Sequence, residues 1–369
     1  MWKKKVGIMS MQRIKNYGSF LQAYALKEII KELGYNVEFV DYHIEKNIIQ
    51  NEKRNNKIAK IIEVIKCRGK LIHKIQYIIH KKNFGKKYYD ILELTKCPKY
   101  NSKLDTLVIG SDEVFNCVQK NQKVGYSMEL FGKNNKAKRL ISYAASFGNT
   151  TLEKLEKYQK KEEIGQLLNE FDALSVRDEN SKKIVSTLTG RKCIFNLDPV
   201  LIYDYMNKCE KIPKLDIKEK YIIVYAYNGR ISDEESKNIR EFAKKNNYKI
   251  YSIGGTQECT DKFIDCSPFE VLAYFKNAEF VITDTFHGSI FSVITKRNFV
   301  TLVRKSVGNE YGNEEKLTDL LNRLKLQGQI IYDIKEIEQK LQTNLNYEET
   351  DKIICNERHN AYEYLKNNI

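Results

Sequence analysis

Short apolar runs alternate along the chain with longer segments in which apolar residues recur every three or four positions. The first half predicts strands at 5–9, 37–42, 106–109, 139–143, 173–176 and 193–196, and helices at about 19–33 and 152–170. The alternation restarts with strands at 221–225, 249–253, 280–283 and 298–303, and helices at 232–246, 268–276 and 289–295. Strands separated by helices of this length form parallel sheets with helices on both faces. The pattern therefore predicts an α/β fold.

The length of the chain predicts more than one domain, because 369 residues exceed what one hydrophobic core usually supports. Residues 208–220 are polar, rich in lysine and contain Pro213, so we expect a linker there. This places one α/β domain at 1–207 and a second at 221–345. Two such domains in succession place a cleft between them, and ligands of open parallel sheets bind beyond the carboxyl ends of the strands.

The positive charge is concentrated in one segment. The net charge is +15, and Lys46 to Asp90 holds thirteen Lys or Arg against three acidic residues. Isoleucines recur there at largely helical spacing, at positions 58, 61, 62, 65, 72, 75 and 79. The pattern predicts a basic helical arm at 46–90.

Two interpretations of the arm at 46–90 stay open at this point. It could be a surface helix that packs on its domain through the isoleucines. It could contact a membrane surface through anionic lipid or a lipid-linked diphosphate. Nucleic acid is not expected as a partner, because the sequence contains no recognised nucleic-acid-binding motif.

The remaining composition narrows the class of protein. No apolar run approaches the roughly 20 residues that a spanning helix needs, and the first residues lack the apolar stretch of a signal peptide. We therefore expect a cytoplasmic protein. The eight cysteines form no CxxC pair and have no histidine at metal-ligand spacing, so neither a disulfide framework nor a metal site is expected.

Four loops that follow predicted strands carry the candidate chemistry. The segment Asp284 to Gly288 interrupts two apolar runs, and a strand followed by a helix would place His287 and Gly288 at a helix N-terminus, where anions are favoured. The loop after the first strand contains Asn16, Tyr17 and Gly18, which could also form an ordinary strand-to-helix turn.

The two other loops each have a structural alternative. Gly110, Ser111 and Asp112 follow a strand, and Asp112 could simply cap a helix. Arg177 and Asp178 follow another strand and could form a surface ion pair of little energetic value.

Six segments, taken in order, resemble the polysaccharide pyruvyl transferase family. They are NYGSFLQAYALKEIIKELGYNVEFVDY at 16–42, GSDEVFN at 110–116, SYAASFG at 142–148, SVRDENS at 175–181, LDPVL at 197–201 and TDTFHGSIFS at 283–292. The resemblance implies two Rossmann-like domains facing a cleft, as in GT-B glycosyltransferases, and a C-terminal helix at 346–369 that returns to the first domain.

The resemblance also implies an activity. Pyruvate would pass from phosphoenolpyruvate to two hydroxyls of a sugar, in a cell-surface polysaccharide or its lipid-linked precursor, and form a cyclic ketal. Phosphoenolpyruvate would be a co-substrate, and no metal or other cofactor would be needed. Two alternatives are a nucleotide-sugar glycosyltransferase and a non-catalytic component of glycan assembly at the inner face of the cytoplasmic membrane.

Roles follow for the residues that match the family motifs. His287 is the expected general acid, because imidazole can supply a proton near neutral pH. Asp112 is the expected base or acceptor ligand, and Asp284 orients His287 or caps the next helix. The expected donor ligands are Arg177, His287, Gly288, Ser289, Arg304 and Lys316. The expected acceptor ligands are Asn16, Tyr17, Gly18, Ser111 and Asp112. The chain departs from the family pattern in its tail region. Lys316 stands where a basic residue is expected, but lysine substitutes poorly for a bidentate arginine, and Gln329 stands where an arginine is expected.

Overall fold

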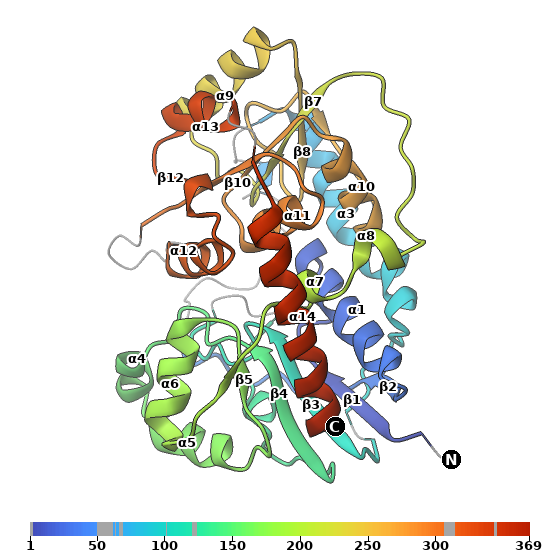
Figure 1. Ribbon diagram of the computed structural model, residues 1–369, viewed down its shortest axis with the longest axis vertical. Helices are drawn as coiled ribbons and strands as arrows, with labels where there is room; N and C mark the ends of the chain where they lie inside the picture. The colour runs from blue at the N-terminus through green and yellow to red at the C-terminus, as the bar shows by residue number, and fades with distance from the viewer. Residues whose placement is uncertain are drawn as a thin grey trace.

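The fold contains two separate sheets of parallel strands. The computed structural model describes residues 3–49, 62, 64–65, 69–100, 102–119, 124–305, 314–342 and 345–369. Within them the chain forms two six-stranded sheets, which lie one above the other in Figure 1. All strand pairs within the two sheets are parallel, as the alternating pattern predicted.

The strands of each sheet come from one half of the chain. The first sheet has the order β2-β1-β3-β4-β5-β6, formed by β1 (Lys5–Met9), β2 (Asn36–Phe39), β3 (Thr106–Asp112), β4 (Arg139–Ala145), β5 (Ser175–Val176) and β6 (Ile194–Phe195). The second has the order β12-β11-β10-β7-β8-β9, formed by β7 (Tyr221–Tyr225), β8 (Lys249–Ile253), β9 (Lys262–Phe263), β10 (Phe280–Thr283), β11 (Phe299–Leu302) and β12 (Ile330–Ile331).

Helices connect the strands and cover the sheets. The α-helices are α1 (Tyr17–Glu32), α3 (Leu71–Tyr88), α4 (Leu152–Lys157), α5 (Lys161–Asn169), α6 (Glu179–Thr189), α7 (Pro199–Ile202), α8 (Tyr205–Lys208), α9 (Asp233–Lys245), α10 (Pro268–Asn277), α11 (Phe286–Ile294), α12 (Glu314–Arg323), α13 (Ile337–Gln342) and α14 (Glu348–Asn368). Short 3-10 helices are η1 (Tyr89–Leu92), η2 (Met128–Phe131), η3 (Gln327–Gln329) and η4 (Ile334–Glu336).

Most predicted elements are present, and the helices expected at 152–170 and 289–295 differ most from the structure. The expected helix at 152–170 is two helices, α4 and α5, because the chain turns at Gln159, whose φ is 54°. The helix expected at 289–295 begins three residues earlier, at Phe286, because the side chain of Thr285 caps it. The earlier start places His287 in the first turn of α11.

Helices α1 and α10 join the two halves in one apolar core. Phe269 of α10 makes edge-to-face contacts with Phe20 and Tyr24 of α1, at ring-centroid distances of 6.1 and 5.0 Å. At the end of the chain, α14 runs from the second sheet to the first (Figure 1). The hydroxyl of Tyr364 in α14 donates to the carbonyl oxygen of Ser142 in β4 at 2.8 Å. These contacts fix the sheets relative to each other.

Helix α3 packs on the protein with a different face from the one expected. The described isoleucines of the predicted stripe are exposed: Ile72 is 58% exposed, Ile75 43% and Ile79 47%. The buried face carries His73, His80, Phe84 and Tyr88 instead, so the interpretation that the isoleucines pack on the domain is wrong. The positions 58 and 61 of the stripe lie outside the described residues.

Candidate functional site

A cavity of about 390 Å³ lies between the two halves, at the carboxyl ends of the strands. The loops that follow β1, β3 and β5 of the first sheet and β7 and β10 of the second line this cavity. The predicted site residues that line it are Asn16, Tyr17, Gly18, Asp112, Arg177, Asp284, His287 and Lys316. Loops more than 250 residues apart therefore converge, as expected for ligand sites at the strand ends.

Four predicted site residues do not line this cavity. Ser111 is fully buried and donates its hydroxyl to the carbonyl oxygen of Ala144 at 3.1 Å. Ser289 is also fully buried, and its hydroxyl donates to the carbonyl oxygen of Thr285. Gly288 donates its backbone N–H to Oγ1 of Thr285 at 3.0 Å, and Nε of Arg304 lies 3.2 Å from Oδ2 of Asp284. The structure therefore places these four around the site rather than at its surface.

His287 meets the first half of the chain at Gly18. A Cβ atom added at Gly18 would stand 2.3 Å from Nδ1 of His287 and 2.4 Å from its Cγ, so only glycine permits this approach. The other ring nitrogen, Nε2, lies 3.7 Å from Oδ2 of Asp198. This distance exceeds that of a hydrogen bond, and Nε2 has no hydrogen-bond partner among the described residues.

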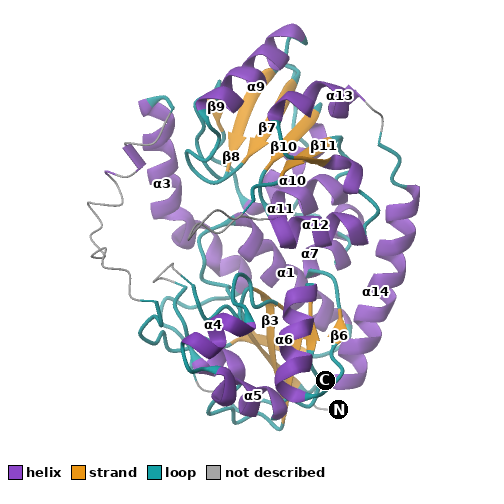
Figure 2. Ribbon diagram, turned by 90° about the vertical axis from the view of Figure 1, so that its left-hand side faces the viewer, coloured by secondary structure: helices purple, strands orange, loops and turns teal. Residues whose placement is uncertain are grey.

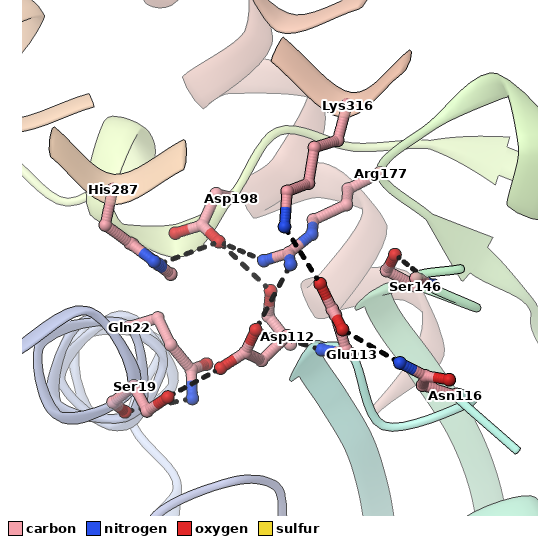
Figure 3. A network of polar contacts seen from close by, with 12 residues as sticks. Ser19, Gln22, Asp112, Glu113, Asn116, Ser146, Arg177, Asp198, His287 and Lys316 are labelled. Carbon is pink, nitrogen blue, oxygen red and sulfur yellow. Dashed lines mark hydrogen bonds and ion pairs between the residues drawn. The ribbon is translucent and has the colours of Figure 1, made fainter. Parts of the chain in front are cut away.

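Arg177 lies between two buried carboxylates (Figure 3). Its guanidinium donates to Oδ2 of Asp198 at 2.6 Å and to Oδ1 of Asp112 at 3.1 Å. The side chain is 5% exposed and stacks on the ring of Phe286, with Cζ 4.5 Å from the centroid. The interpretation that Arg177 forms a surface ion pair is therefore wrong, because two charge-assisted bonds fix its guanidinium inside the site.

The carboxylates of Asp112 and Asp198 stay ionised despite their burial. Burial raises the pKa of Asp112, but Arg177 and then His287 and the hydroxyl of Ser19 hold it below its usual value. Burial likewise raises the pKa of Asp198, and His287 and Arg177 hold it below its usual value. Both groups therefore carry negative charge near neutral pH.

Asp112 ends β3 and does not cap a helix, so the capping interpretation is wrong. Its Oδ2 accepts from the hydroxyl of Ser19 in α1 at 2.8 Å, and its Oδ1 accepts from the backbone N–H of Glu113 at 2.9 Å. The first turn of α1 is itself fixed by Asn16, whose side chain accepts from the backbone N–H of Ser19 at 2.7 Å. Asp112 thus links β3, α1 and Arg177 at the cavity floor.

An ion pair crosses the cavity from one half to the other. Nζ of Lys316, in α12, lies 3.3 Å from Oε1 of Glu113, directly after β3 (Figure 3). Oε2 of Glu113 accepts from the side-chain amide of Asn116 at 2.9 Å. Lys316 therefore presents positive charge to the cavity at a contact between the two halves.

Asp284 belongs to a second cluster, on the side of the second sheet. Its Oδ2 lies 2.9 Å from Nε of Arg230 and 3.2 Å from Nε of Arg304. Burial raises the pKa of Asp284, and the two arginines oppose the rise. Arg304 also pairs with both oxygens of Glu235 in α9. The N-cap of α11 is Thr285, so the expectation that Asp284 caps this helix is wrong.

Three residues of the site were not assigned a role from the sequence. They are Asp198, Glu113 and Arg230. Asp198 follows a short strand, and it stands before Pro199 at the start of α7, a common N-cap pattern. Ligands of parallel sheets bind beyond the carboxyl ends of the strands, and this rule applies to β6 as well. Asp198 could therefore have been found from the sequence. No signal in the sequence pointed to Arg230, because it stands five residues beyond β7 in an irregular segment.

Comparison with known families decides the classification. The family model for polysaccharide pyruvyl transferase matches residues 16–306. The chain belongs to the polysaccharide pyruvyl transferase family. It is accordingly a transferase with a role in pyruvyl transfer during polysaccharide synthesis. A search of curated proteins found no match to the chain.

Solved structures share the fold at low sequence identity. A protein from Listeria monocytogenes described as a UDP-N-acetylglucosamine 2-epimerase has a TM-score of 0.50 and 11% identity, over 96% of this chain and 91% of that chain. The enzyme of that name from Rickettsia bellii has a TM-score of 0.49 and 12% identity, over 100% and 99% of the two chains. The likeness shows the fold alone: two Rossmann-like domains facing a cleft, as in GT-B glycosyltransferases.

Proposed function

We propose that the chain transfers pyruvate from phosphoenolpyruvate to two hydroxyls of a sugar, in a cell-surface polysaccharide or its lipid-linked precursor. The position of His287 supports this most directly, because a protonatable imidazole stands in the first turn of α11, inside a cavity shared by both halves. A helix N-terminus favours phosphate or carboxylate. A proton donor beside an anion site is what protonation of phosphoenolpyruvate requires.

The reaction balances without a redox step. His287 donates a proton to the methylene carbon of phosphoenolpyruvate, and a sugar hydroxyl attacks the adjacent carbon as it gains oxocarbenium character. The bond from that carbon to the phosphate oxygen breaks, and the second hydroxyl attacks the same carbon to close the ketal. One of the two hydroxyl protons restores His287, and the other leaves with phosphate.

In this proposal, basic side chains bind the donor and Asp112 binds the acceptor. Lys316, Arg230 and Arg177 line the cavity and supply positive charge for the donor. Asp112 stays ionised, so it accepts a hydrogen bond from a sugar hydroxyl and orients it, and Asn16 lines the same cavity. The weak basicity of Asp112 makes orientation its proposed role in place of proton removal.

Calorimetric titration with phosphoenolpyruvate at low salt tests the donor site. We expect saturable binding to the wild type, weaker binding to His287→Ala, and phosphate release in the presence of acceptor that falls by about 10²-fold or more in this variant. His43→Ala is the matched control, because His43 is an exposed histidine bound to Glu129. Normal turnover in His287→Ala would contradict the assignment of the acid. Thermal protection by a uridine diphosphate sugar, with no response to phosphoenolpyruvate, would favour a nucleotide-sugar glycosyltransferase.

A further inference from the structure

Exposed apolar side chains gather on one small part of the surface. Among the described residues, eleven large apolar side chains are exposed, and six of them lie between positions 62 and 79: Ile62, Ile65, Leu71, Ile72, Ile75 and Ile79. Leu71 and Ile72 are the most exposed of these, at 59% and 58%. Scattered exposed apolar residues are ordinary, but a contiguous group marks a contact surface.

The opposite face of α3 is fixed to the second sheet, so the exposed group cannot turn inward. Nδ1 of His80 lies 2.5 Å from Oδ1 of Asp265, and His80 is 2% exposed. The ring of Tyr77 packs edge-to-face on Phe263 of β9, with centroids 6.1 Å apart. Figure 2 shows α3 at the edge of the molecule, beside β9. The isoleucines therefore face outward in the folded protein.

Basic side chains continue the apolar face along α3. Positions 71, 75, 79, 82 and 86 recur at helical spacing, so Leu71, Ile75 and Ile79 share a face with the exposed Lys82 and Lys86. The helix contains five lysines and no acidic residue, and the exposed Lys70 precedes it. Apolar side chains next to exposed lysines match a bilayer with anionic headgroups, which offers hydrocarbon and negative charge together.

We propose that the outward face of α3, formed by Leu71, Ile72, Ile75, Ile79, Lys82 and Lys86, docks on an anionic membrane surface. Among the described residues no helix has the length and hydropathy to cross a bilayer, so the contact is interfacial. Tyr77 and Lys81 of the same helix line the cavity between the halves. Docking through α3 places the cavity beside the headgroups, where an acceptor sugar carried on a lipid would be within reach. The proposal does not depend on the identity of the donor.

Flotation with vesicles tests the proposal directly. We expect the full chain to float with vesicles of phosphatidylcholine and phosphatidylglycerol, and to remain behind with phosphatidylcholine alone. Binding should weaken from 0.1 M to 1 M salt, because the Debye length falls from about 10 Å to about 3 Å. A variant with Lys70→Gln, Lys82→Gln and Lys86→Gln should partition about a hundredfold more weakly, from about 1 kcal/mol per lysine at 1.4 kcal/mol per tenfold. Wild type that fails to float at low salt would overturn the proposal.

Replacing isoleucines separates the membrane from other occupants of this face. The triple variant Ile72→Ser, Ile75→Ser, Ile79→Ser should lose vesicle binding, whereas Ile194→Ser, which alters an isoleucine that is 46% exposed on β6, should retain it. In a second measurement, Ile75→Trp should shift its fluorescence to the blue with anionic vesicles, and Ile194→Trp should not. Unchanged binding in the triple variant, or a dimer in the wild type that the triple variant converts to a monomer, would overturn the proposal.

Discussion

At the scale of single residues, the site depends on one arginine that binds two carboxylates. Arg177 pairs with two buried carboxylates, and without it Asp112 and Asp198 would lose the guanidinium that they share. The same two carboxylates hold the guanidinium in place, and His287 stands at the edge of the group, 3.7 Å from Asp198. The group therefore has its charge positions fixed before any substrate binds, which is how preorganised sites stabilise developing charge.

The variant Asp198→Asn should destabilise the protein at neutral pH. It leaves Arg177 with one carboxylate, and breaking a buried pair costs about 3 kcal/mol. Because the pKa of Asp198 is below its usual value in the folded state, its contribution is present above about pH 4 and is lost as the pH falls through the lower folded value. The difference between wild type and variant should therefore shrink below about pH 4. Urea unfolding at a series of pH values measures it.

A surface aspartate provides the comparison for Asp198. Asp351 pairs with Lys296 at 2.6 Å, and both side chains are about half exposed. Asp351→Asn should change the unfolding free energy by less than about 1 kcal/mol at every pH. If Asp198→Asn and wild type have equal unfolding free energies at pH 7, the bond between Arg177 and Asp198 does not contribute to stability.

The variant Gly18→Ala should impair turnover with little change in folding. Its methyl group would occupy the space of the His287 ring, and moving a catalytic group by about 1 Å can cost about 10²-fold in rate. Phosphate release under saturating substrate measures the effect. Gly328→Ala is a suitable control, because nothing lies within 4 Å of a Cβ added there. Full activity in Gly18→Ala would mean that the ring moves without consequence, and that its contact with α1 is not needed.

At the scale of elements, periodicity predicted the strands well, but the packing face expected for α3 was wrong. The bounds of β1, β7, β8 and β10 are as predicted, because a continuous apolar run is all that a buried parallel strand requires. For α3 the pattern correctly grouped the isoleucines on one face, yet the packing face is set by partners such as Asp265, 185 residues beyond His80. No local pattern contains that contact, so the outward direction of the isoleucines could not be predicted.

The first turn of α11 offers a test at the scale of an element. Oγ1 of Thr285 accepts from the backbone N–H of Gly288 at 3.0 Å. Thr285→Ala should lower the unfolding free energy by about 1 kcal/mol and should also reduce turnover, because the turn holds His287. Thr285→Ser should restore both, since it keeps the hydroxyl. The cap of α4 gives the matched control: Thr151→Ala should lose similar stability with normal turnover. Equal turnover in the two alanine variants would argue against a link between this cap and His287.

At the scale of the whole molecule, the site exists only where the two halves meet. Gly18 and Glu113 come from the first half, and His287 and Lys316 come from the second. The strand-end rule predicted that such loops would gather at a cleft, and it brought most of the candidate residues to the cavity wall. It could not predict which pairs touch, because the angle between the halves is set by contacts such as those of α1 with α10.

The ion pair between Glu113 and Lys316 can be either a donor site or a contact that holds the halves together, and a double-mutant cycle separates these roles. We predict that Lys316→Met raises the KM for phosphoenolpyruvate about tenfold, because a charge-assisted bond to phosphate contributes about 1.5 kcal/mol or more. Glu113→Gln should leave this KM nearly unchanged, and the double variant should match Lys316→Met.

If both single variants and the double variant instead show the same loss, the pair of Glu113 and Lys316 acts only as a contact between the halves. Lys335→Met controls for charge alone, because Lys335 forms an exposed pair with Glu234. A rise in KM for Lys316→Met and the double variant, without a rise for Glu113→Gln, would establish that Lys316 binds the donor.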